Sequence, residues 1–141
     1  MDSRAEHRRM SLQLDRPPTL PPDTVAAGLR AFFRIAQQWN LSNDEAIVLL
    51  GQPARSTFFK WKKGEIGKPA LSFDLATRLG HLLGIFKALE TLYASPELAD
   101  RWIREPNAAL AGQSALSRMM AGQITDLAAV RGYLESVRGG P

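Results

Sequence analysis

Apolar side chains recur at helical spacing along most of this 141-residue chain, and no stretch alternates between apolar and polar residues. Residues 23–39 set the pattern, with apolar positions three or four residues apart. That period places the apolar side chains on one face of a helix, whereas a half-buried strand needs a period of two. The sequence therefore predicts an all-α fold with no sheet.

Capping residues, glycines and prolines divide this pattern into separate helices. Ser42 and Glu45 have the spacing of a capping box, which predicts a short helix over 46–50 that Gly51 closes. We expect a third helix over 55–63, a long helix from Ser72 to Tyr93, and shorter helices over 96–104, 114–121 and 126–137. Residues 1–22 end in closely spaced prolines and are assigned to a flexible arm.

The positive charge of the chain is concentrated where two short helices follow a longer one, which is the outline of a helix-turn-helix. The whole chain carries +4, and residues 52–68 alone contain Arg55, Lys60, Lys62, Lys63 and Lys68 against the single acid Glu65. A charge cluster is usually only a solvated face. Here it coincides with the helix-turn-helix punctuation, so residues 23–70 are predicted to bind DNA.

Helix 55–63 is predicted to present a polar face to the DNA. Phe58 and Trp61 fall on its inward side, with Lys62 near its edge, and Ser56, Phe59, Lys60 and Lys63 fall on the other side. Lysines neutralise phosphates, and the free amides at a helix N-terminus also attract them. The candidate DNA-binding residues are Gln52, Arg55, Ser56, Thr57, Lys60, Lys62 and Lys63.

Other functional classes find little support in the sequence. The chain has no cysteine, and no nucleophile elbow, phosphate loop or metal-ligand spacing appears. His81 lies in an apolar helix, where a core or edge histidine is more common than a ligand. Gly80 and Gly84 have a spacing that permits close helix packing. We expect no catalytic residues, no metal, no cofactor and no membrane span.

Residues 50–64 resemble the helix-turn-helix of the Xre-like antitoxins of the MbcA/ParS/Xre family. The downstream half resembles that family's toxin-binding domain at residues 99–103, 106–107, 110–114, 116, 119–120, 122 and 130–134. Ala115 departs from the pattern, since proline is common there. The resemblance implies a cytoplasmic antitoxin that inhibits a RES-type toxin, an NAD-consuming enzyme, and represses its own operon.

On this resemblance, residues 95–141 form the toxin-binding region. Residues 71–94 form a long connecting helix whose apolar positions span more than one narrow stripe, so we expect this helix to hold a homodimer together. The candidate toxin contacts are Trp102, Leu110, Arg131, Tyr133, Arg138, Gly139 and Gly140, although Trp102 and Leu110 also suit a core. We expect the basic, glycine-rich segment 138–141 to leave the helix, either frayed or as an extended probe that enters the toxin.

Two other functions fit the same residues. One is a free-standing helix-turn-helix repressor whose C-terminal half dimerises or senses a ligand. The other is an adaptor that binds protein and never DNA. Salt-dependent DNA binding separates the adaptor from the other two functions, and a stable complex with the product of the neighbouring gene separates the antitoxin from the repressor.

Overall fold

The structure, a computed structural model, describes residues 22–67 and 72–139, and all regular elements in these ranges are helical. In chain order they are α2 (Pro22–Gln38), α3 (Asn43–Leu49), α4 (Arg55–Lys62), α5 (Phe73–Leu92), α6 (Pro96–Trp102), the 3₁₀ helix η1 (Ala108–Leu110), α7 (Ala115–Met119) and α8 (Ile124–Gly139). Among these residues the one β pairing is an isolated bridge between Pro106 and Ser114. The predicted all-α fold class is confirmed.

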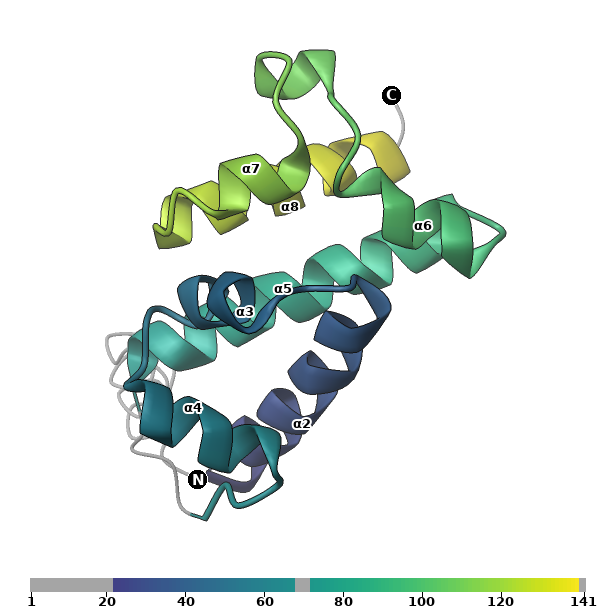
Figure 1. Cartoon of the computed structure of the whole chain (residues 1–141). Helices are drawn as coiled ribbons and strands as arrows, with labels where there is room; N and C mark the ends of the chain where they lie inside the picture. The colour runs from purple at the N-terminus through teal and green to yellow at the C-terminus, as the bar shows by residue number, and fades with distance from the viewer. Residues whose placement is uncertain (1–21, 68–71, 140–141) are drawn as a thin grey trace, which may run out of the picture.

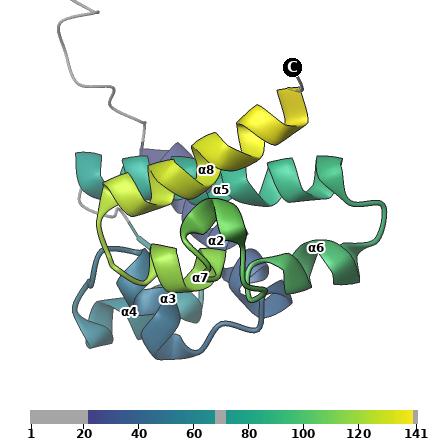
Figure 2. The ribbon, with the colours of Figure 1, turned by 90° about the horizontal axis from the view of Figure 1, so that it is seen from above.

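Helix α5 runs through the middle of the molecule, with α2 and α4 below it and α7 and α8 above it in the view of Figure 1. Helix α8 packs along α5, as Figure 2 also shows, and α2 and α6 contact it too. One hydrophobic core contains side chains from α2 through α8. The N-terminal and C-terminal halves therefore share their interior, with α5 as the common wall.

This packing corrects the role that we assigned to the long helix. The apolar surface of α5 extends around much of the helix because it contacts several other helices of the same chain. The residues buried there include Leu75, Leu79, Leu82, Ile85, Ala88 and Leu89. A surface already covered by α2 and α8 is not free to form a dimer seam. The homodimer stays a prediction, and its seam would have to use another surface.

The predicted helix starts are made by side-chain caps. The Glu45 amide donates to Ser42 Oγ at 3.0 Å, and the Ser42 amide donates to Glu45 Oε1 at 2.8 Å. This is the predicted capping box, and α3 begins at Asn43, directly after the cap and earlier than we expected. Ser72, Ser95 and Ser114 likewise accept hydrogen bonds at the starts of α5, α6 and α7.

The main error lies at the end of the chain. Helix α8 continues through Arg138 and Gly139, so the expectation that this segment leaves the helix is wrong for both residues. Glycine in a helix costs only about 1 kcal/mol relative to alanine, and α8 is anchored by its buried residues Leu127, Val130 and Leu134. Gly140, Pro141 and the predicted arm before Pro22 lie outside the described residues.

Candidate functional site

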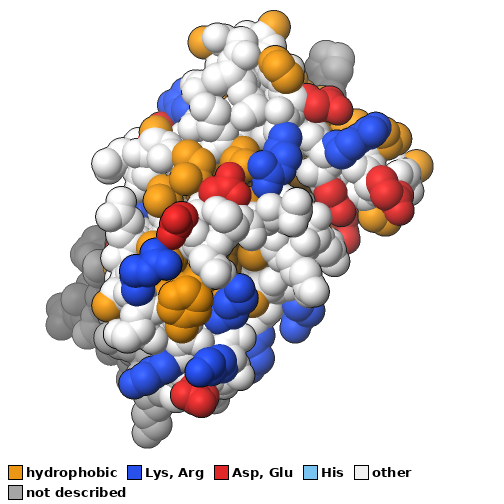
Figure 3. Space-filling model, in the orientation of Figure 1, with side chains coloured by type: hydrophobic (Ala, Val, Ile, Leu, Met, Phe, Trp, Pro, Cys, Tyr) orange, Lys and Arg blue, Asp and Glu red, His pale blue; other side chains and the backbone are white. Residues whose placement is uncertain are grey.

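Helix α4 presents the polar face that the sequence predicts. Phe58 is 1% exposed and packs on α2, where its ring lies 5.5 Å from that of Phe33. Ser56, Lys60 and Lys63 are exposed on the opposite side. Figure 3 shows blue side chains gathered around an apolar patch at the α4 end of the molecule. The lysine ammonium groups can thus approach a polyanion, while the buried Phe58 on the other side anchors α4 to α2.

Arg55 and Lys62 are held against the start of α3, a feature that the sequence reasoning missed. The Arg55 guanidinium pairs with Asp44 at 2.7 Å and lies 5.6 Å above the Phe59 ring. Lys62 Nζ donates to Asn43 Oδ1 at 2.6 Å. Residues 55 and 62 are seven positions apart, nearly two helical turns, and this spacing is the available signal that they share a face. Both cations flank the outward face rather than lie at its centre.

A groove of about 460 Å³ extends this basic surface between α2, α3 and α4. Its charged lining residues are Arg34 and Lys62, and amide side chains of Gln37, Asn40 and Asn43 lie beside them. None of the residues that line it is acidic. Its chemistry therefore matches that of the α4 face, since cations and amides both attract phosphate oxygens.

The turn between α3 and α4 rests on α5. Gly51 and Gln52 have φ values of 86° and 60°, in the left-handed region that favours glycine. A Cβ atom on Gly51 would lie 2.8 Å from both Arg78 Nε and Asp74 Oδ2, which themselves form an ion pair at 2.8 Å. Arg78 is 7% exposed. Helix α5 thus sets the position of the turn that aims α4, and it places Gln52 at the exposed start of that helix.

The candidate contacts of the C-terminal half are divided between core and surface. Leu110 is 6% exposed, so it serves the core and offers no contact surface. Trp102 and Tyr133 are half-buried, and their rings stack with centroids 6.2 Å apart and 11° between the planes. Arg138 and Gly139 are exposed at the end of α8, and Gly140 lies outside the described residues.

Arg131 lies across α5 instead of pointing into solvent. Its Nε donates to Glu135 at 2.9 Å, and its Nη1 donates to the Gly80 carbonyl at 3.3 Å. A Cβ atom on Gly84 would lie 2.6 Å from Arg131 Nε, so Gly84 makes room for this side chain, whereas a Cβ atom on Gly80 would meet nothing within 4 Å. Arg131 therefore joins α8 to α5, while its side chain stays 36% exposed.

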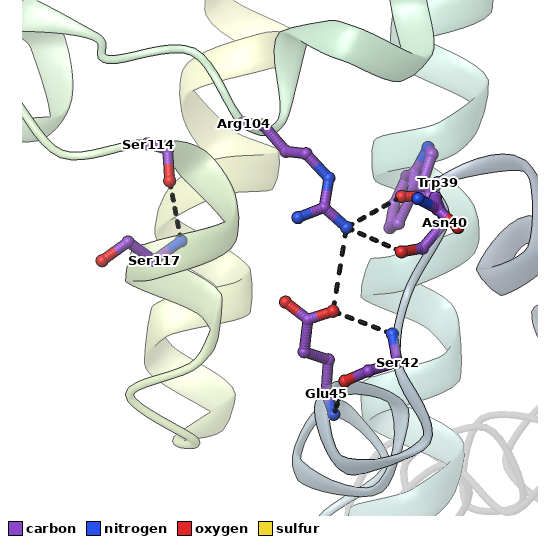
Figure 4. Close-up of polar contacts among 7 residues, drawn as sticks. All are labelled: Trp39, Asn40, Ser42, Glu45, Arg104, Ser114 and Ser117. Carbon is purple, nitrogen blue, oxygen red and sulfur yellow. Dashed lines mark hydrogen bonds and ion pairs between the residues drawn. The ribbon is translucent and has the colours of Figure 1, made fainter.

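Arg104, which the sequence did not single out, connects the two halves (Figure 4). It follows α6, and its Nη2 donates to the carbonyl oxygens of Trp39 at 3.1 Å and Asn40 at 2.8 Å, where α2 has just ended. The same nitrogen lies 3.7 Å from Glu45 Oε1, within the capping box of α3. A cation from the C-terminal half thus satisfies backbone carbonyls of the N-terminal half.

The described residues offer neither a cluster of metal ligands nor a membrane-spanning helix. They hold no group of three or more His, Cys, Asp or Glu side chains that could bind a metal ion. His81 is half-buried, and burial together with the nearby Arg131 lowers its pKa, while Glu135 acts in the opposite direction. Within the same residues, no helix combines the length and apolarity needed to cross a lipid bilayer.

Comparison with known proteins assigns a description to each half. Residues 20–84 match the family described as the antitoxin Xre-like helix-turn-helix domain. Residues 88–140 match the family described as the antitoxin Xre/MbcA/ParS C-terminal toxin-binding domain. The chain is also 53% identical over 116 residues to the uncharacterized protein y4oB of Sinorhizobium fredii, covering 82% of this chain and 88% of the relative.

Proposed function

The chain belongs to the Xre/MbcA/ParS family of antitoxins, and we propose that it neutralises a RES-type, NAD-consuming toxin by direct binding and represses its own operon by binding DNA. The observation that carries the proposal is the division of the chain into two matched halves on one shared core. The N-terminal half presents exposed lysines on α4, and the C-terminal half matches the family of toxin-binding domains.

The DNA-binding part rests on the geometry of α4. Ser56, Lys60 and Lys63 point away from the core and are free to reach a major groove, while Arg55 and Lys62 flank them at the start of α3. Gln52 and Thr57 lie at the N-terminal end of α4, close to its free backbone amides. A single helix of this kind has few base contacts, so a homodimer on two half-sites is part of the proposal.

The toxin-binding part rests on the C-terminal match and on the exposed end of α8. Because α8 stays helical through Gly139, we propose that a helix end, and not an extended tail, approaches the toxin's cleft. Arg138 is exposed there and is free to pair with acceptors or acids. Both proposed partners, the NAD-consuming enzyme and the operon, place the protein in the cytoplasm.

The DNA-binding proposal is tested by reversing the charge of the outward face. Lys60→Glu with Lys63→Glu replaces two attractive phosphate contacts by repulsive ones, and the core stays intact because both side chains are exposed. We expect loss of the gel shift with the duplex upstream of the chain's own gene. In the parent, the two contacts should account for roughly 1.8 of the slope of log affinity against log salt concentration.

Lys87→Glu is the matched control, since Lys87 is exposed on α5, outside α4. It should retain the shift. If the double variant shifts the duplex as strongly as the parent at equal salt, α4 does not read DNA. The toxin part is tested by co-expression with the RES-type toxin that the proposal assigns as the partner. Loss of residues 95–141 also removes the helices that complete the core, so the decisive outcome is full growth rescue without them, which would refute toxin binding by this half.

A further inference from the structure

The turn between α2 and α3 lacks backbone partners for two of its carbonyl groups. Asn40, whose φ is 53°, closes α2 in a Schellman motif. Its amide donates to the Gln37 carbonyl at 3.1 Å, and the Leu41 amide donates to the Ala36 carbonyl at 2.9 Å. No backbone amide of the described residues donates to the carbonyl oxygens of Trp39 and Asn40. This turn therefore depends on a side chain for its remaining hydrogen bonds.

Arg104 supplies those hydrogen bonds from the C-terminal half (Figure 4). One nitrogen, Nη2, donates to the Trp39 carbonyl at 3.1 Å and to the Asn40 carbonyl at 2.8 Å. The same nitrogen lies 3.7 Å from Glu45 Oε1, the oxygen that accepts from the Ser42 amide in the capping box of α3. Arg104 thus holds the end of α2 and the start of α3 together, and it restrains the angle between these two helices.

The first residues of α3 in turn hold α4. Asn43 Oδ1 accepts from Lys62 Nζ at 2.6 Å, and Asp44 Oδ1 accepts from Arg55 Nη1 at 2.7 Å. Lys62 and Arg55 lie at opposite ends of α4, so the two contacts restrain the direction of this helix. The next residue of α3, Glu45, is the one that pairs with the arginine of the C-terminal half. Three consecutive residues therefore join that arginine to α4.

We propose that Arg104 is a positioning residue for DNA binding. It fixes the turn between α2 and α3 and, through residues 43–45, the direction in which α4 presents its outward lysines. The inference rests on the DNA-binding part of the proposed function. Arg104 lies within residues 88–140, which match the toxin-binding family, and outside residues 20–84, which match the helix-turn-helix. Full DNA affinity of the helix-turn-helix therefore requires a residue of the other half.

The dependence of DNA affinity on salt separates positioning from direct contact. A side chain that neutralises a phosphate contributes about 0.9 to the slope of log affinity against log salt concentration, whereas a residue that never touches the DNA contributes nothing to it. The Arg104 guanidinium already donates to two carbonyls at the end of α2, and it belongs to neither α4 nor the lining of the groove beside it. Its loss should therefore change the affinity and leave the slope as it is.

The test measures DNA binding of full-length Arg104→Ala by fluorescence anisotropy, with the duplex upstream of the chain's own gene. Over a series of salt concentrations, we expect the affinity to fall about two- to thirtyfold with an unchanged slope. Lys60→Gln, which removes a proposed phosphate contact, should instead lower the slope by about 0.9. Arg104→Lys should recover part of the affinity, because one ammonium group can donate to both carbonyls.

Arg118→Ala is the matched control, since it also removes an arginine that joins two helices. Arg118 Nε donates to Asp126 at 2.9 Å and so links α7 to α8, within the C-terminal half. Its side chain is 36% exposed, against 44% for Arg104. At a temperature where circular dichroism shows both variants folded, Arg118→Ala should bind the duplex as tightly as the parent. Equal losses of affinity in the two variants would show that binding follows overall stability, and would overturn the inference.

The outcomes for the proposed function and for Arg104 are separable. If the parent chain does not bind the duplex, the DNA-binding proposal fails and this inference falls with it. If the parent binds and Arg104→Ala binds equally well, the positioning role is wrong and the DNA-binding proposal stands. If Arg104→Ala lowers the slope as Lys60→Gln does, Arg104 contacts the DNA itself and the positioning role is overturned.

Discussion

Replacing Arg104 by alanine tests whether the two halves of the chain stabilise each other. The guanidinium reaches from the segment after α6 to two carbonyl oxygens at the end of α2, at 2.8 Å for Asn40 and 3.1 Å for Trp39. Those carbonyls have lost their helical partners because α2 ends there. Truncation at Cβ removes both hydrogen bonds and leaves the Ser42–Glu45 capping box intact.

The size of the effect follows from the geometry. A hydrogen bond to a charged group contributes about 1.5–3 kcal/mol when buried, but the Arg104 side chain is 44% exposed, so water replaces part of each bond. Halving the two contributions gives about 2 kcal/mol. The Glu45 carboxylate at 3.7 Å adds only a few tenths of a kcal/mol, as exposed ion pairs do. For a chain of this length, we expect the Tm to fall by about 6 °C.

Urea unfolding of the full chain at 25 °C measures this loss, with an unchanged m value as evidence that the unfolding transition is the same. Arg101→Ala is the control, because Arg101 lies three residues earlier, is exposed and forms no ion pair with a described residue. Arg101→Ala should cost less than about 0.5 kcal/mol. If Arg104→Ala costs no more than Arg101→Ala, the contact with α2 does not join the halves and the reasoning is refuted.

Two further predictions concern the turn and the one described histidine. Gly51→Ala adds a Cβ atom 2.8 Å from Asp74 and Arg78 at φ 86°, whereas Gly64→Ala meets nothing within 4 Å at φ 94°. Both should lose about 1–2 kcal/mol to the left-handed backbone, and Gly51→Ala should lose about 1 kcal/mol more because its Cβ displaces an ion pair whose arginine is buried and whose aspartate is half exposed. Equal losses in urea unfolding would contradict the packing of the turn on α5. The pKa of His81 is lowered in the folded chain by burial and Arg131, from an ordinary value of 6.5. Its neutral form therefore stabilises the fold above pH 6.5, and this contribution is lost as the pH falls through the lowered value. His81→Gln should flatten the decline of Tm between pH 7.5 and 5.5, and an unchanged decline would show that another group is responsible.

The local features of the chain were predictable because their causes lie within one or two helical turns. Ser42 and Glu45 are three residues apart, so their spacing alone predicts the reciprocal cap that the structure contains. The inward side of α4 is equally local, since the position of Phe58 within one helical period decides that it is buried. The residue pattern of the C-terminal half likewise indicates the family, because the pattern lies in the sequence itself.

What the tertiary structure decided depends on residues far apart in the sequence. Arg131 and Gly80 are 51 positions apart, and only the packing of α8 on α5 directs this arginine, a candidate toxin contact, onto a neighbouring helix. Arg104 reaches Trp39 across 65 positions. The width of the apolar surface on α5 was visible in the sequence, but its meaning was not, because one helix pattern serves a dimer seam or an interior wall equally well. Periodicity reports which face of a helix is apolar, and only the placement of the other helices decides what covers that face.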